Sequence, residues 1–145
     1  MAYVTGQEIL TTETLNVDPT TTNVLPLGGF VQGDPIKRIS DVVGRETQIA
    51  TDIVSGFLIN DQVFPYTKKV LNIVTRGKVE ITVAGAYPIN SLMFLDAVNP
   101  RRLVALNQAA AGTGVARQCL GRLMTATTLA GDKAILDIQF QQMYV

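Results

Sequence analysis

The sequence predicts an all-β fold, on the basis of its composition and of two patterns along the chain. Valine, isoleucine and threonine together supply 43 of the 145 residues, and their branched side chains favour the half-buried surface of a sheet. From Phe30 onwards, short apolar runs are bounded by glycine, asparagine, aspartate and proline, which is the spacing of a small barrel or sandwich. Val79, Ile81 and Val83 alternate with polar residues, which predicts a strand with one buried face and one solvent face.

The turn residues between these runs divide the chain into expected strands. They are 35–39, 48–59, 62–66, 71–75, 77–83, 91–95, 103–106, 115–126 and 133–140. In the last of these, Leu136, Ile138 and Phe140 form an apolar face that is expected to pack on a core. One segment has two interpretations: Asn99 and Pro100 could begin a helix that Gly112 ends, or they could form a turn before a strand at 103–106. We favour the strand.

Residues 1–29 differ from the rest of the chain and are expected to form an extended N-terminal arm, followed by a barrel domain over 30–145. Asp18-Pro19 and Leu25-Pro26 disfavour helix and interrupt strand pairing. The first 36 residues carry four acidic and no basic side chains, so the remaining residues carry a charge of +4 in a chain of zero net charge. Such an arm is expected to be an edge strand or a tail that pairs elsewhere, and a loose chain end is the alternative.

The composition argues against an enzyme and against bound cofactors or metals. There is no histidine and a single cysteine, Cys119, so the usual proton shuttle and the usual zinc ligands are missing. We expect Cys119 to be a buried apolar residue and Asp34, Asp61 and Asp132 to be turn formers rather than acid or base catalysts.

The charge and hydropathy patterns also make some partners improbable. A zero net charge does not favour nucleic acid, and no apolar stretch is long enough to cross a bilayer as a helix. The basic pairs Lys68-Lys69 and Arg101-Arg102 are expected to lie in solvated turns. No secretory signal is evident at the N-terminus, so synthesis in a cytoplasm is expected.

The order of strands and turns from Gly77 to Phe140 carries a resemblance. Gly77 opens an alternating strand, Asp96 ends an apolar strand, Gly121 lies inside the next long strand, and Ala130-Gly131-Asp132 leads into the last one. This order resembles the capsid cement or decoration proteins of tailed bacteriophages. The resemblance implies a small β-barrel or β-tulip without enzyme activity, which assembles as a trimer at threefold sites on the outside of the phage head and stabilises the shell.

Under this interpretation the protein is located on the virion, its partners are the major capsid protein and two further copies of itself, and the arm pairs with the capsid protein. The expected apolar anchors of the arm are Tyr3, Val4, Ile9, Leu10, Leu15 and Val17. Deletion of residues 2–25 is then expected to abolish shell binding while leaving the trimer intact. Two alternatives remain open: another virion β-protein of the tail or neck, and a ligand-binding β-barrel whose cavity is lined by Tyr66, Tyr87 and Phe94.

Overall fold

The computed structural model describes residues 6–18, 30–59, 61, 70–109 and 114–145, and these residues form strands, turns and loops without a helix. The all-β prediction is therefore confirmed. All nine strands belong to one sheet. They are β1 (Glu8–Val17), β2 (Pro35–Arg38), β3 (Val43–Glu46), β4 (Val54–Leu58), β5 (Val70–Thr82), β6 (Leu92–Leu95), β7 (Leu103–Ala105), β8 (Ala116–Leu123) and β9 (Lys133–Tyr144).

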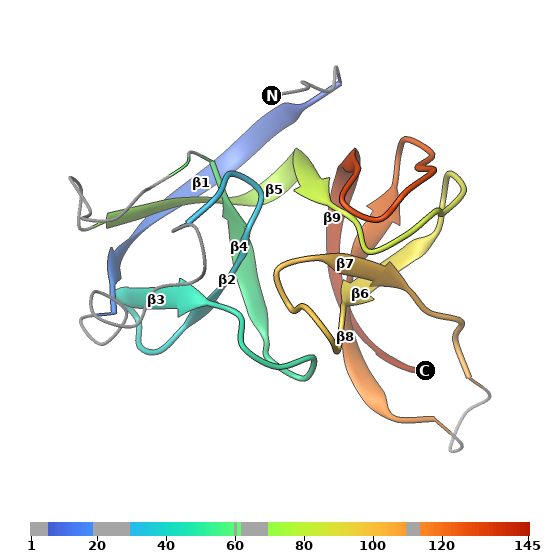
Figure 1. The fold of residues 1–145 in the computed structure, drawn as a ribbon. Coiled ribbons are helices and arrows are strands. Elements are labelled where there is room, and N and C mark those ends of the chain that lie inside the picture. Colours follow the sequence, from blue (N-terminus) through green and yellow to red (C-terminus); the bar gives the residue numbers. More distant parts are fainter. Residues whose placement is uncertain (1–5, 19–29, 60, 62–69, 110–113) are drawn as a thin grey trace.

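The first five strands close into a small barrel, because the order β1-β3-β2-β4-β5 is completed by a direct pairing of β5 with β1. β1 runs parallel to β3 at Asn16 and Val17 and antiparallel to β5 over most of its length. We call this barrel the first lobe, and it occupies the left half of Figure 1. Closure removes most of the free sheet edges that a short open sheet would expose.

The second lobe, on the right of Figure 1, continues from the C-terminal half of β5 in the order β5-β9-β8-β6-β7. It returns towards its start through a parallel bridge between Val83 and Leu103. The backbone N–H of Ala84 donates to the carbonyl of Leu103 at 2.8 Å. Both lobes are thus rolled pieces of the same sheet, and β5 belongs to both.

Gly77 lies where β5 passes from one lobe to the other, and its backbone has a φ of +119°. A Cβ at this position would meet the carbonyl oxygen of Glu8 in β1 at 2.1 Å. Only glycine combines this backbone angle with so close an approach of the neighbouring strand. The residue therefore allows β1 to pair with β5 up to the point where the lobes meet.

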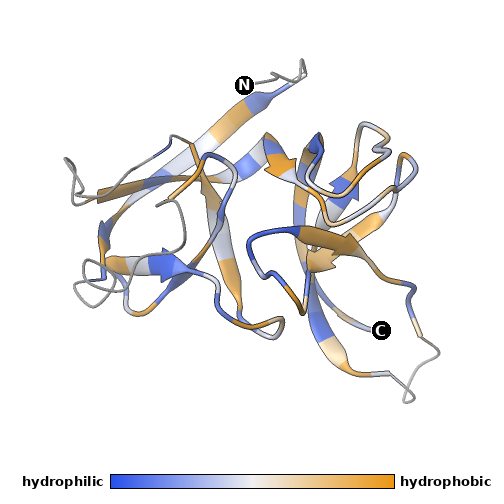
Figure 2. Cartoon of the chain, viewed as in Figure 1, coloured by the Kyte–Doolittle hydropathy of each residue, from blue (hydrophilic) through white to orange (hydrophobic). Residues whose placement is uncertain are grey.

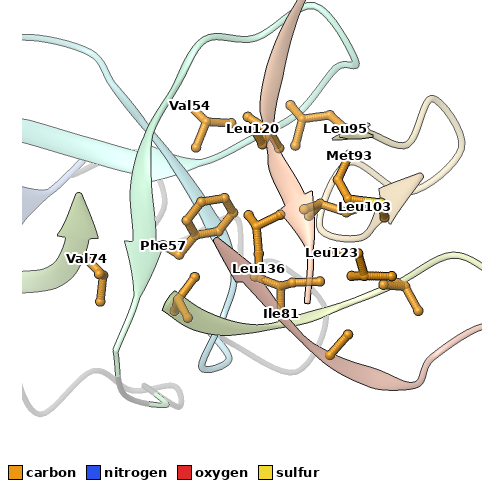
Figure 3. Packing of buried hydrophobic residues seen from close by; sticks show 13 residues of the cluster. Val54, Phe57, Val74, Ile81, Met93, Leu95, Leu103, Leu120, Leu123 and Leu136 are labelled. Carbon is orange, nitrogen blue, oxygen red and sulfur yellow. The ribbon is translucent and has the colours of Figure 1, made fainter. Parts of the chain in front are cut away.

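Two clusters of buried apolar side chains fill the protein. The first lies inside the closed barrel and consists of Leu15, Val17, Phe30, Ile36, Leu58, Leu71 and Ile73. The second is larger and extends between the lobes, because Val54, Phe57 and Val74 of the first lobe pack against side chains of the second (Figure 3). Figure 2 shows that apolar and polar residues follow one another at short intervals along the strands. The burial of this second cluster fixes the lobes against each other.

Several of the expected strands agree with the structure and others do not. The segment 103–106 is a strand, β7, rather than part of a helix. The segments 71–75 and 77–83 are one continuous strand, β5. Residues 48–53 form a turn-rich loop before β4 instead of a strand. Strand β3 is not among the expected strands. The expected strand 62–66 lies outside the described residues.

The predicted faces of β5 and β9 are confirmed only in part. Val79, Ile81 and Val83 are fully buried as expected. Glu80, on the predicted solvent face, is also buried, because the turn around Gly33 packs on its backbone: a Cβ on Gly33 would lie 2.5 Å from the Glu80 carbonyl oxygen. In β9, Leu136 packs in the core, but Phe140 is an exposed residue near the end of the strand.

Candidate interaction surfaces

The expected N-terminal arm is in part a strand of the chain's own sheet. β1 pairs with β5 from Glu8 to Asn16, and Glu13 forms an ion pair with Arg38. Its opposite backbone edge meets β3 only at Asn16 and Val17. From Glu8 to Leu15, that edge has no strand partner among the residues that the structure describes, so it is open to a further strand.

The expected anchors on this segment separate into two groups. Ile9 and Leu10 are exposed, with 40% and 59% of their surface accessible. Leu10 lies at a register shift between the pairs Ile9–Gly77 and Thr11–Arg76, so it has no partner residue on β5. Tyr3 and Val4 lie outside the described residues.

Leu15 and Val17 require a correction. Both belong to the core cluster of the first lobe, where only 2% and 6% of their surface is accessible. The alternation of β1 points them into the barrel, which closes only because β1 is part of it. They are core residues rather than anchors for a partner protein.

Arg101 and Asp34 form the main polar contact between the lobes. Nε and Nη2 of Arg101 donate to the two oxygens of Asp34 at 3.2 and 2.8 Å, a two-point arrangement that suits a guanidinium and a carboxylate. Burial raises the pKa of Asp34, and the Arg101 contact partly offsets this effect. The expectation that Arg101 belongs to a solvated turn is therefore wrong, while Lys68 and Lys69 lie outside the described residues.

Three further hydrogen bonds join the lobes close to the buried cluster. The hydroxyl of Thr47 donates to the carbonyl of Pro100 at 2.7 Å. The side-chain amide of Gln118 in β8 accepts from the N–H of Val54 at 2.6 Å and donates to its carbonyl at 3.0 Å, as a neighbouring peptide group would. These bonds hold the two lobes together beside the shared core.

The three turn aspartates have different environments. Asp132 accepts the N–H groups of Thr128 and Leu129, each at 3.0 Å, and these bonds lower its pKa. Asp61 accepts the N–H of Gln32 at 2.7 Å. Asp34 accepts the N–H of Val31 at 2.9 Å in addition to its contact with Arg101. Asp34 and Asp132 accept backbone N–H groups three or four residues away, as expected for turn formers, whereas the N–H group that Asp61 accepts lies 29 residues away in the sequence.

An apolar groove runs between the lobes, from the loop before β4 to the ends of β8 and β9. It consists of two adjoining hollows of about 360 and 270 Å³. Both are lined by Thr51 and Arg117; the remaining walls come from Ala50, Ile53, Leu106, Asn107, Val115, Ala116, Gln118, Phe140, Gln141, Gln142 and Val145. We call this feature the inter-lobe groove.

Arg117 is the charged residue that both hollows share. Its Nη2 donates to the carbonyls of Leu95 and Ala50, and its guanidinium carbon lies 6.0 Å from the ring centroid of Phe94. Its Nε is buried and has no hydrogen-bond partner among the described residues. Burial lowers the pKa of Arg117, and the charge of Asp96 partly offsets this effect. Within the described part of the chain, both hydrogen bonds of its side chain go to neutral carbonyl oxygens.

The groove does not follow from the sequence pattern, because residues 48–53, which form one of its walls, are predicted to belong to a strand over 48–59. In the structure the carboxylate of Asp52 accepts the N–H groups of Gln48 and Ile49 at 2.7 and 3.1 Å and contacts Lys37 at 3.2 Å. This folds the segment into a turn and leaves Ile49 and Ile53 facing solvent. The signal in the sequence was an aspartate in the middle of an apolar run, a residue that favours turns.

The described part of the chain holds no group of side chains that could bind a metal ion. No cluster of three or more cysteine, aspartate or glutamate side chains occurs there. Cys119 is buried, and burial raises the pKa of its thiol, which disfavours the reactive thiolate. No helix in the described residues is long and apolar enough to cross a membrane.

The aromatic residues expected to line a ligand cavity are not gathered around one. Phe94 is fully buried below Arg117, and Tyr87 packs against the larger core cluster. Tyr66 lies outside the described residues. Phe94 and Tyr87, the two of these three residues that the structure describes, are part of the packing of the second lobe.

No model of a known protein family matches this chain, and no curated protein matches it. The resemblance to phage cement proteins consequently depends on the strand and turn order of the second half of the chain.

Proposed function

We propose that this protein is a viral structural protein, a cement or decoration protein that binds the outside of a tailed-phage head as a trimer and stabilises the shell. The observation that carries the proposal is the open edge of β1. From Glu8 to Leu15 it combines backbone groups that have no strand partner on this side within the described part of the chain with the exposed apolar side chains of Ile9 and Leu10. An extended segment of the major capsid protein would add to this edge as a further strand.

The remaining features support a role that depends on contacts rather than on chemistry. The two lobes are joined by a continuous core, a two-point ion pair and side-chain hydrogen bonds, so the molecule can transmit force between its binding surfaces. Exposed apolar side chains lie next to each other on β1, at Ile9 and Leu10, and in the β2–β3 turn, at Ile39 and Val42, and adjoining exposed apolar side chains are a feature of protein–protein contact surfaces. A partner that binds only the assembled shell stabilises it by mass action.

The copy number of the protein in purified virions tests the proposal directly. Intact-mass spectrometry and quantitative gels of the virus that encodes this sequence should show the 15.6 kDa chain in hundreds of copies, at a fixed ratio to the major capsid protein. A few to a dozen copies would assign the protein to the tail or neck. Its absence from virions would overturn the proposal.

The binding edge is tested by substitutions rather than by truncation. Deletion of residues 2–25 would remove Leu15 and Val17 from the core. The trimer is therefore not expected to survive this deletion, in contrast to what the sequence predicts. The paired change Ile9→Ser and Leu10→Ser leaves the core untouched and should reduce binding to shells that lack the protein by at least about tenfold, or about 1.4 kcal/mol. Leu129→Ser, at an exposed apolar residue in the loop between β8 and β9, is the matched control and should bind normally.

A further inference from the structure

The turn between β2 and β3 presents an exposed apolar tip. It consists of residues 39–42, in which Ile39 and Val42 have 53% and 60% of their surface accessible and Asp41 is also exposed. We call it the β2–β3 tip. The N–H of Ile39 donates to the carbonyl of Val43 at 2.8 Å, and Nη1 of Arg38 donates to the carbonyl of Asp41 at 2.8 Å. The tip is therefore held in one shape before any partner binds, which lowers the entropy cost of binding.

The inter-lobe groove has the complementary chemistry. Its walls include Ala50, Leu106, Val115 and Val145, and its charged group is Arg117. The two hydrogen bonds that Nη2 of Arg117 makes in the described part of the chain go to backbone carbonyls, so they leave its positive charge without a bonded carboxylate. An occupant with two apolar side chains and one carboxylate would bury the walls and pair with this charge.

The tip and the groove cannot meet within one molecule. The tip precedes β3, and the loop that forms the groove wall follows it, so the two features lie at opposite ends of the same strand. Figure 1 shows the β2–β3 turn at the outer side of the first lobe, whereas the groove lies where the lobes meet. A contact between them therefore requires two copies and joins different surfaces of the two molecules.

We propose that the β2–β3 tip of one copy inserts into the inter-lobe groove of the next, with Ile39 and Val42 against its apolar walls and Asp41 directed at Arg117. Such a head-to-tail contact leaves a free tip on one copy and a free groove on the other, so it is satisfied only when a ring closes. The number of copies in the ring, three, rests on the proposed function. The self-contact then uses a surface separate from the Ile9 and Leu10 edge that binds the shell.

The test uses one variant on each side of the contact. Val42→Asp damages the tip and Val115→Asp damages the groove, and each position is exposed, so neither change enters the core. Each variant alone should sediment as a monomer in analytical ultracentrifugation where the unaltered protein is a trimer, because a charge placed in an apolar contact is costly. Mixed in equal amounts, they should form a heterodimer, since one intact tip still meets one intact groove.

Two controls separate this contact from a general loss of folding. Leu129→Asp introduces the same charge at an exposed apolar residue outside the tip and the groove, and it should remain trimeric. Cysteines placed on the tip and in the groove test the contact directly, in chains that are otherwise unaltered. When the Ser40→Cys variant is mixed with the Thr51→Cys variant, mild oxidation should form a disulfide between two copies. When the Ser40→Cys variant is mixed with the Thr128→Cys variant, no such disulfide should form. The native Cys119 is buried and does not compete.

Three results would overturn the inference: an unaltered protein that is monomeric, single variants that stay trimeric, or a mixture that yields no heterodimer. Shell binding is measured separately, on the same variants. A monomeric variant that still binds shells weakly would support both proposals, because loss of avidity is the expected cost of losing the ring. Intact trimers that fail to bind shells would instead count against the proposed function alone.

Discussion

Arg101 and Asp34 connect the two lobes through a pair of hydrogen bonds, at 3.2 Å from Nε to Oδ1 and 2.8 Å from Nη2 to Oδ2. Asp34 lies immediately before β2 in the first lobe, and Arg101 lies between β6 and β7 in the second. The side chains retain only 7% and 20% of their accessible surface, respectively. Two charges that are far apart in the sequence thus become one contact at the junction.

Removal of Arg101 should destabilise the protein strongly, because it leaves the buried carboxylate of Asp34 without its main partner. We expect Arg101→Ala to lower the free energy of unfolding by about 2–4 kcal/mol. Arg102→Ala, at the adjacent and similarly half-exposed residue, should change it by less than about 0.5 kcal/mol. Urea unfolding of both variants measures the difference, and equal effects would show that the ion pair does not stabilise the junction.

The turn made by Asp52 should give the protein an acid-dependent stability. Burial by itself raises the pKa of Asp52, but the N–H groups of Gln48 and Ile49 and the Lys37 ammonium outweigh it, so the pKa lies below 3.8. The ionised form is therefore favoured in the folded state, and its contribution is present above pH 3.8 and is lost as the pH falls through the lowered pKa. Asp52→Ala should cost about 1–2 kcal/mol at neutral pH.

That cost should shrink in acid, because protonation removes the same interactions from the unaltered protein. Urea unfolding of both proteins across the acidic range measures this convergence. A cost independent of pH would show that the charge of Asp52 does not contribute.

Gly77 and Gly6 provide a matched pair for the junction of the lobes. Both have positive φ, +119° and +103°, so alanine is strained at either position. A Cβ at Gly6 meets nothing within 4 Å, whereas at Gly77 it meets the Glu8 carbonyl oxygen at 2.1 Å. Gly77→Ala should therefore destabilise the protein by at least about 2 kcal/mol more than Gly6→Ala does. Thermal and urea unfolding test this, and similar losses would mean that β1 can move aside at little cost.

Leu15 and Leu10 test whether β1 belongs to the core or forms a free arm. Leu15→Ala should cost about 2–5 kcal/mol of unfolding free energy, because it opens a cavity in the closed barrel. Leu10→Ala, on the same strand but exposed, should cost less than about 0.5 kcal/mol. If Leu15→Ala were as mild as Leu10→Ala, β1 would not be an integral part of the barrel in solution.

Local patterns of the sequence were enough to predict the fold class and several elements. The alternation of Val79, Ile81 and Val83 predicts their shared buried face, since side chains of a strand alternate between its two sides. The turn before residue 103 marks the start of β7. The acceptor roles of Asp34 and Asp132 follow from their positions in short turns.

The candidate interaction surfaces depend on contacts that no local pattern reports. Leu15 and Val17 lie in a segment whose composition predicts an arm. Their burial follows only from the pairing of β1 with β5 and β3, which are distant in the sequence. Glu80 lies on the face of β5 that the alternation predicts to face solvent, yet the turn at Gly33 covers it. Arg117 becomes a groove residue because the loop before β4 is packed against the ends of β8 and β9.

The sequence by itself determined that the chain is built from strands, where most of its turns lie and which faces of those strands are apolar, because these properties depend on near neighbours and on a period of two. The tertiary structure decided which strands become neighbours, that β5 is shared by two rolled lobes, and which apolar side chains remain exposed. Those outcomes depend on pairings between distant segments, and a one-residue change in register would exchange every buried side chain of a strand for an exposed one.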